Sequence, residues 1–360
     1  MKILNKLLLL FIALFIVLGC NPQPANKARE VWSKERANEW YKKLGWLRGC
    51  NFIPSTAINQ LEMWQAETFD TITIDRELGW AESIGLNAMR VFLHHAAWQS
   101  DSAGFKQRVG KYLTIANRHG IATIFVLFDD CWNPTYKTGK QPEPKRGIHN
   151  SGWIRDPGDL LYSDTTLIVK LEEYVKDMLR SFASDNRIVL WDVYNEPGNS
   201  NYGNKSEKLL RKVFQWGREA NPSQPLTSGV WNLNLGKLNN IQIENSDIIS
   251  YHNYQNDTLH KQCIDTLRRY GKPLICSEYM ARKHRSRFDN IMPLLKNENI
   301  AAINWGLVAG KTNTMYAWDE PIPDGSEPKL WFHEIFRKDG KPYKEEEVQL
   351  IRKLTGKKNQ

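Results

Sequence analysis

Two glutamates in the sequence each end a short run of apolar and β-branched residues. Residues 188–194 lead into Asn195-Glu196-Pro197, and residues 273–277 lead into Glu278-Tyr279. Parallel strands bring their carboxyl ends to one edge, so the two side chains are expected at the same rim. Hydrolysis of a glycosidic bond needs such a pair, because one carboxyl protonates the leaving oxygen and the other stabilises or attacks C1. Either glutamate alone fits a solvated strand end, but the pair indicates a hydrolytic site.

The rest of the chain alternates in the same way. Helical spacing of apolar residues is clear in residues 70–84, which Gly85 closes. Strand followed by helix, repeated, predicts an α/β fold with a parallel sheet, and eight repeats predict a single-domain (β/α)8 TIM barrel. The absence of G-x-G-x-x-G after the first run argues against dinucleotide binding. The predicted strands are 48–53, 88–93, 121–128, 188–194, 225–231, 247–254, 273–279 and 301–308, and the predicted helices are 70–84, 104–119, 165–184, 205–220, 257–270, 285–296 and 344–354.

Two connections are longer than a barrel loop requires, 129–164 after strand three and 309–330 after strand eight. Loops after the strands build the active-site face of a barrel, and long loops without secondary structure tend to be functional. Candidate sugar contacts on these connections are Asp129, Asp130, Trp132 and Lys311.

His94 and His95 follow strand two. Successive strand residues point to opposite faces, so only one of the two can face the site. That expectation argues against a two-histidine metal site, and no metal or other cofactor is predicted.

These motifs resemble those of clan A glycoside hydrolases, and most closely the cellulase-type family 5. The resemblance covers essentially the whole mature chain, from Arg48-Gly49-Cys50-Asn51 to Trp305. It implies that Glu196 is the acid/base, that Glu278 is the nucleophile and that Asn195 bonds the sugar 2-hydroxyl. The other site residues that it implies are Arg90, which keeps the nucleophile ionised, His252 and Tyr254 beside it, and Trp305 under the sugar ring.

The expected function is therefore retaining hydrolysis of β-linked oligo- or polysaccharides. Fourteen Trp residues agree with sugar stacking, and Trp191 and Trp231 are expected to give Glu196 an apolar setting. Many family members place a histidine at the end of strand three, where this chain has Asp129, so sugar and linkage stay open. An inactive carbohydrate-binding barrel and a transglycosylase using the same covalent intermediate are the alternative hypotheses.

The N-terminal residues have the features of a targeting segment. Lys2 and Lys6 precede an apolar run, Leu7 to Leu18, that is too short to cross a hydrocarbon core of ~30 Å as a helix. Val17-Leu18-Gly19-Cys20 resembles a bacterial lipobox, in which the Cys is lipidated. The predicted divisions are a signal peptide over 1–19, a lipid-anchored tether over 20–34 and a catalytic domain over 35–360.

The residues after Cys20 lack an acidic cluster. We therefore expect a lipoprotein of the bacterial cell envelope, facing the periplasm from the outer membrane. The net charge of +9 is scattered along the chain, which argues against nucleic-acid binding, and a monomer is expected. The cysteines after Cys20 allow three disulfide connectivities, between which the sequence does not choose: Cys50, Cys131, Cys263 and Cys276.

Overall fold

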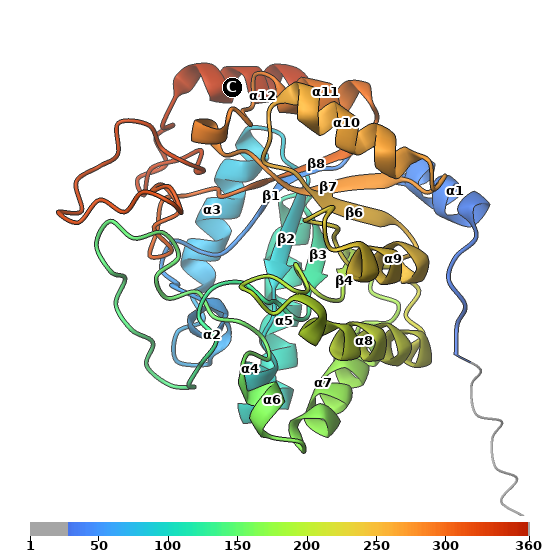
Figure 1. The fold of residues 1–360 in the computed structure, drawn as a ribbon. Helices are drawn as coiled ribbons and strands as arrows, with labels where there is room; N and C mark the ends of the chain where they lie inside the picture. Colours follow the sequence, from blue (N-terminus) through green and yellow to red (C-terminus); the bar gives the residue numbers. More distant parts are fainter. Residues whose placement is uncertain (1–27, 359–360) are drawn as a thin grey trace, which may run out of the picture.

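The computed structural model describes residues 28–358, and its strands form a central barrel surrounded by helices (Figure 1). The predicted signal peptide and Cys20 lie outside the described residues. All eight predicted strands are present, each within or at the predicted bounds. They are β1 Arg48–Asn51, β2 Ala88–Phe92, β3 Ala122–Val126, β4 Ile188–Asp192, β5 Leu226–Thr227, β6 Ile249–His252, β7 Leu274–Tyr279 and β8 Ala301–Trp305.

The strands are parallel and lie in the order β5-β4-β3-β2-β1-β8-β7-β6. The remaining gap, between β5 and β6, is bridged just beyond β5. Val230 donates its N–H to the carbonyl of Ser250 at 3.0 Å, and His252 donates to the carbonyl of Val230 at 2.9 Å. These bonds close the sheet and confirm the predicted (β/α)8 barrel.

All seven predicted helices are present, although α11 begins at Ile291 rather than at residue 285. The residues before it form a short 3-10 turn, Arg282–His284, and Arg285 then takes a positive φ of 62°. Five further helices within residues 28–358 were not predicted from the spacing. The helices are α1 Lys34–Leu44, α2 Gln60–Trp64, α3 Thr71–Ser83, α4 His95–Ser100, α5 Ser102–Arg118, α6 Leu160–Ser163, α7 Leu167–Ser181, α8 Glu207–Ala220, α9 Gly236–Asn245, α10 Asp257–Arg268, α11 Ile291–Asn297 and α12 Glu345–Thr355. No helix in the described range is long and apolar enough to cross a membrane.

The first helix closes the N-terminal end of the barrel. Tyr41 of α1 is buried in one cluster with interior residues of the strands, among them Ala88 and Ile124. The chain already packs against this end before α1: Arg29 bonds Asp247 at 2.6 Å, and the backbone N–H of Trp32 bonds the same carboxylate at 2.8 Å. Residues 29–34, predicted as part of the tether, therefore belong to the folded domain.

Alternation along the strands separates the barrel interior from the layer under the helices. Trp191 of β4 points outward: its ring packs 5.6 Å from that of Phe125, and its indole N–H bonds Gln224. The prediction that Trp191 gives Glu196 an apolar setting is therefore wrong. Asp192, the next residue, points inward to Arg90.

The two long connections lie side by side (Figure 1, the green and the orange-red loops on one flank). The N–H of Asn150 bonds the carbonyl of Thr312 at 2.8 Å, and the N–H of Ile322 bonds that of Gly147 at 3.0 Å. A Cβ at Gly147 would stand 1.7 Å from the Ile322 oxygen, so this approach requires glycine. The loops after β3 and β8 thus form one continuous wall at the mouth of the barrel.

Candidate active site

A cavity of about 590 Å³ opens where the strands end, and both glutamates lie in its wall. Aromatic side chains dominate this wall, as is usual for sites that take sugar rings. The lining residues are Cys131, Trp132, Asn133, His149, Asn150, Trp153, Asn195, Glu196, Asn199, Ser200, Trp231, Tyr254, Glu278, Trp305, Trp318 and His333.

Glu196 stands on a tight turn directly after β4. Its φ is 45°, in the left-handed region that non-glycine residues avoid at a cost of about 1–3 kcal/mol. Asp130 holds this turn, because it accepts bonds from the N–H of Gly198 at 2.8 Å and from the hydroxyls of Tyr194 at 2.7 Å and Ser206 at 2.5 Å. The surrounding bonds therefore fix the direction in which Glu196 points.

Glu278 enters the cavity through an irregularity in β7. Ile275 belongs to the barrel interior, so simple alternation would turn Glu278 outward. The pairing register shifts between Cys276 and Tyr279, and both of these residues pack in the outer core. A β-bulge of this kind re-aims a side chain, and here it turns Glu278 into the cavity.

The two carboxylates are close together. One oxygen of Glu196 and one of Glu278 lie within 4.8 Å of each other and of a ring nitrogen of His252. His252 Nδ1 is 2.6 Å from Glu196 Oε1 and 3.5 Å from Glu278 Oε2. Retaining glycosidases hold their carboxyls ~5–5.5 Å apart, and inverting enzymes ~6.5–9.5 Å apart to admit a water. The spacing here has the retaining geometry.

Arg90 of β2 is buried and joins Glu278 to β4. Its guanidinium donates to Glu278 Oε1 at 2.8 Å, to Asp192 Oδ2 at 2.7 Å and to Asn195 Oδ1 at 2.6 Å. Burial lowers the pKa of Arg90, but the two carboxylates outweigh burial and raise it overall. Arg90 is thus a permanent cation, as the resemblance implied.

Burial has the larger influence on the two glutamates. It raises the pKa of Glu278 to about 7, while His252, Arg90 and the Tyr254 hydroxyl act to lower that pKa and Glu196 acts to raise it. Burial also raises the pKa of Glu196, against the bonds from Cys131 and Asn199. Arg90 therefore acts to lower the pKa of Glu278, as expected, but burial outweighs its influence.

Other residues implied by the resemblance surround this pair. The hydroxyl of Tyr254 donates to Glu278 Oε2 at 2.8 Å. Burial lowers the pKa of His252 to about 4, so its imidazole is neutral. Trp305, the loop residue Trp132 and Trp231 lie in the cavity wall.

Three of the candidate sugar contacts are not part of the cavity wall. Asp129 is buried and accepts bonds from Asn195 Nδ2 at 2.8 Å and from the Trp153 indole at 2.7 Å. Asp130 holds the turn of Glu196, and Lys311 bonds Glu62 at 2.6 Å. We correct the prediction for Asp129, Asp130 and Lys311. Their side chains bond to other groups of the protein and position the residues that line the site.

The sequence did not single out several lining residues. Trp153 and Trp318 lie in the two long connections, where the Trp residues were a usable signal. His149 lies in the first connection, and His333 lies beyond the second, where no motif marks it. All four cysteines of the described region are free, which answers the open disulfide question.

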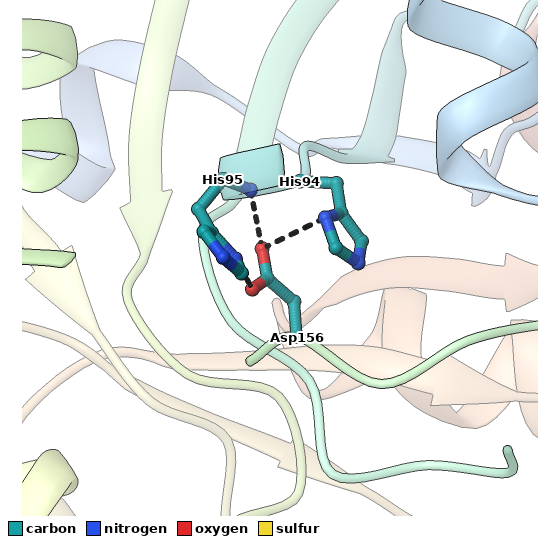
Figure 2. Close-up of side chains that lie close together, drawn as sticks. All are labelled: His94, His95 and Asp156. Atoms are coloured by element: carbon teal, nitrogen blue, oxygen red, sulfur yellow. Dashed lines mark hydrogen bonds and ion pairs between the residues drawn. The ribbon is translucent and has the colours of Figure 1, made fainter. Parts of the chain in front are cut away.

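The pair His94 and His95 lies outside this cavity, against Asp156 (Figure 2). Both histidines point to Asp156 because the strand ends at Phe92 and α4 begins at His95, so strand alternation no longer applies. Neither histidine lines the cavity, although strand alternation would have allowed one of them to do so.

His94, His95 and Asp156 are also residues of metal-ligand type, but hydrogen bonds occupy all four ring nitrogens. His94 accepts from the Ala96 N–H at 3.2 Å and bonds the Arg155 carbonyl at 3.2 Å. His95 bonds Asp156 through one nitrogen and the Tyr136 hydroxyl at 3.0 Å through the other. The cluster fastens the loop after β3 to the start of α4.

Comparison with protein families places residues 81–311 in the cellulase model, described as glycosyl hydrolase family 5. Comparison with curated proteins gives no match. Among solved structures, the chain is similar to the endo-β-1,4-mannanase from Thermotoga petrophila, with a TM-score of 0.54 and 15% identity, covering 85% of this chain and 76% of that one.

It is also similar to an exo-β-1,4-mannosidase from Opitutaceae bacterium strain TAV5, with a TM-score of 0.61, 17% identity and coverage of 86% and 60%. A third similar structure, from Bifidobacterium longum and in complex with Manβ1-4GlcNAc, has a TM-score of 0.61, 12% identity and coverage of 86% and 78%. At these identities the three structures show a shared fold.

Proposed function

Because the chain belongs to glycosyl hydrolase family 5 and is a retaining β-glycosidase, we propose that it cleaves by double displacement, with Glu278 as nucleophile and Glu196 as acid/base. The observation that carries this assignment is the pair of carboxylate oxygens within 4.8 Å, with Arg90 bonded to Glu278 and not to Glu196. The arginine marks the group that must be negative, and the other carboxyl takes the proton.

In the first step, Glu278 attacks C1 and forms an ester with the sugar, while the C1–O bond breaks. Glu196 gives its proton to the departing oxygen. The raised pKa of Glu196 keeps that proton available, and bound substrate replaces the water in the cavity. The Tyr254 hydroxyl and Arg90 stay on Glu278 and stabilise its charge as it is released again.

In the second step, Glu196 is ionised and removes a proton from water, whose oxygen attacks C1 and breaks the ester to Glu278. Three donors or partners surround Glu196 for this state: the Cys131 thiol at 3.2 Å, the Asn199 amide and His252. Glu196 ends the cycle protonated and Glu278 ends it ionised, so the enzyme is unchanged.

Two inversions at C1 give net retention. NMR of the first product released from an aryl β-glycoside should therefore show the β-anomer before mutarotation. A first-formed α-anomer would mean a single displacement by water, and Glu278 would then not be the nucleophile.

For the substrate, β-mannosides are the first class to test, because the similar structures include an endo-β-1,4-mannanase and an exo-β-1,4-mannosidase. Turnover of 4-nitrophenyl β-mannoside and of the matching glucoside, xyloside and galactoside would rank the sugars. A clear preference for another sugar would contradict this choice.

The proposal for location is lipid attachment at Cys20 of a monomeric protein facing the periplasm. It rests on Val17-Leu18-Gly19-Cys20 and on the lack of acidic residues directly after Cys20. Cys20→Ala should move the protein from the membrane fraction to the soluble one, and protease added to intact cells should leave the native protein uncut. A variant that stays in the membrane fraction would contradict lipid attachment.

A further inference from the structure

The cavity has two ends that differ in chemistry. Next to Glu196, the wall consists of Asn199 and Ser200 from the loop after β4 and of Trp231 after β5. The far end is formed by the loops after β3 and β8, which supply His149 and His333 among other residues.

The protein fixes the tautomers of both histidines at the far end. His149 Nδ1 bonds the carbonyl of Tyr316 at 2.8 Å, and His333 Nδ1 bonds the carbonyl of Met280 at 2.5 Å. A carbonyl only accepts, so each Nδ1 carries a proton. Burial lowers the pKa of His149 to about 4 and that of His333 further below its usual value, so both rings are neutral. Each Nε2 is therefore an unprotonated acceptor.

Asn150, which follows His149 in the chain and also lines the cavity, carries a further acceptor. The Asn150 side-chain oxygen is buried and has no hydrogen-bond partner among the described residues, while the backbone N–H of Asn150 is held by Thr312. The rings of His149 and His333 are 5.4 Å apart. Leaving a buried acceptor unpaired costs about 1–3 kcal/mol, so this end of the cavity favours a ligand that brings several donors. Sugar hydroxyls are such donors.

The chemistry of the proposed function decides which part of the substrate lies there. Glu196 must reach the leaving oxygen, so the leaving group occupies the end with Asn199 and Ser200. The sugar whose C1 faces Glu278 must then extend towards the other end. His333 borders that position, with its ring 5.8 Å from Tyr254 and 6.4 Å from Trp305.

The wall at the far end consists of closely packed side chains. His149 and His333 are 4% and 1% exposed, and the Phe332 ring packs 6.0 Å from that of His149 and 4.5 Å from that of His333. Bonds between the two loops reinforce this wall, including that from Asn313 Nδ2 to the Lys145 carbonyl at 3.0 Å. A second sugar on the non-reducing side would have to pass through packed side chains.

We propose that this wall makes the enzyme exo-acting, releasing one sugar at a time from the non-reducing end. His149 and His333 determine specificity by accepting bonds from hydroxyls of that terminal sugar distant from C1. This inference rests on the proposed function. It adds the mode of cutting and the residues that recognise the terminal sugar.

Chain length tests the mode of cutting. The probes are 4-nitrophenyl β-glycosides of mannose, glucose, xylose and galactose, and the β-1,4-linked biosides of the same sugars. Cleavage of a monoside, with its bioside releasing monosaccharide before nitrophenol, is the expected result. Release of intact biose, with slower cleavage of the monoside, would contradict the proposal that the wall makes the enzyme exo-acting. It would leave the proposed β-glycosidase activity unaffected. Failure to cleave any probe would instead contradict the proposed function.

Substitution tests the histidines. Asparagine places its side-chain N–H where Nδ1–H stands, so His149→Asn and His333→Asn keep the bonds to Tyr316 and Met280 but remove the Nε2 acceptors. Wild type should lose about tenfold or more in kcat/KM on one or more monodeoxy glycosides at C3, C4 or C6, because a bond worth about 1.4 kcal/mol is missing. The variants should no longer distinguish the affected deoxy glycoside from its parent.

The control is Ser200→Ala at the opposite end, which should keep the wild-type discrimination between deoxy and parent glycosides. Equal losses of the histidine variants on all glycosides, the deoxy ones included, would show that the residues only brace the wall and would overturn their role in specificity.

Discussion

Glu278 and Glu196 share one cavity but stand in different surroundings. Glu278 is bonded by a permanent cation, Arg90, and by the Tyr254 hydroxyl. Glu196 has no arginine at bonding distance in the described structure; its partners are a thiol, an amide and a neutral imidazole. Burial acts on both carboxyls alike, so the partners must set their difference.

This difference shows how the same fold can give two identical carboxyl groups different roles. A fixed charge stabilises only the ionised carboxylate, whereas an imidazole such as His252 can donate to a carboxylate or accept from a carboxylic acid. Glu196 is thus able to change its proton state within the cycle, whereas Arg90 and Tyr254 favour the ionised form of Glu278 against the burial that raises its pKa.

The largest effect should come from exchanging each glutamate for alanine. Glu278→Ala removes the proposed nucleophile, so turnover should be lost for every leaving group. Glu196→Ala should slow poor leaving groups by about 10²–10⁴-fold and good ones far less, because good ones depart without a proton. Rates on a series of aryl glycosides measure this.

Azide distinguishes the two variants further. It should rescue Glu196→Ala with formation of the β-glycosyl azide and should give the α-azide with Glu278→Ala. The opposite pairing of anomers would exchange the two roles.

Removing the cation should have the next largest effect. Arg90→Met leaves buried Asp192 and Glu278 unpaired, which should destabilise the fold by about 3–5 kcal/mol in urea unfolding. Without Arg90 the pKa of Glu278 rises further, so the acidic limb of kcat/KM should move to higher pH by about one unit.

Arg90→Lys is the matched control for charge. It should move the acidic limb less than Arg90→Met does. An acidic limb that stays in place in Arg90→Met would show that Arg90 braces the barrel without tuning Glu278.

The turn under Glu196 supplies a smaller effect. Asp130→Asn has one side-chain oxygen in place of two, so it should lose either the bond from Tyr194 or those from Gly198 and Ser206, at a cost of about 1–3 kcal/mol of unfolding free energy. Its kcat should fall on poor leaving groups more than on good ones, since the misplaced group is the acid. Equal losses of kcat on poor and good leaving groups would show that the substitution does not act through the acid, Glu196.

The smallest effect should come from the thiol at 3.2 Å from Glu196 Oε2. A donor stabilises the ionised carboxylate, so Cys131→Ala should raise the pKa of Glu196 and move the basic limb of kcat/KM to higher pH by less than about one unit. Cys131→Ser keeps a donor and should leave that limb near its wild-type position. A downward movement in Cys131→Ala would contradict the bond.

The barrel and the two glutamates were predictable because buried parallel strands are continuous apolar runs, and each glutamate ends one of them. The bulge that turns Glu278 into the cavity was not predictable from the sequence. Simple alternation from Ile275 would have placed Glu278 on the outer face of the barrel. Glu278 nevertheless lies in the cavity wall, where the family resemblance, rather than alternation, implied that it would lie.

The polar contacts were less predictable for a different reason. An aspartate at a strand end can bind substrate or bind its own loop, and Asp129 and Asp130 do the latter. A histidine is available to a ligand only when one ring nitrogen is left over, as in His149 but not in His95. Pairing of this kind depends on partners far away in the sequence, which no local pattern records.

The packing of Arg29 and Trp32 against Asp247 has a consequence for orientation. These residues enter the fold at the N-terminal ends of the strands, whereas the cavity opens at the opposite ends. From Cys20 to Arg29 the chain spans nine steps, or at most about 30 Å when extended. An enzyme anchored at Cys20 would thus stand close to the lipid with its base towards the bilayer and its mouth towards the surrounding fluid, ready for soluble chains rather than for glycolipids in its own membrane.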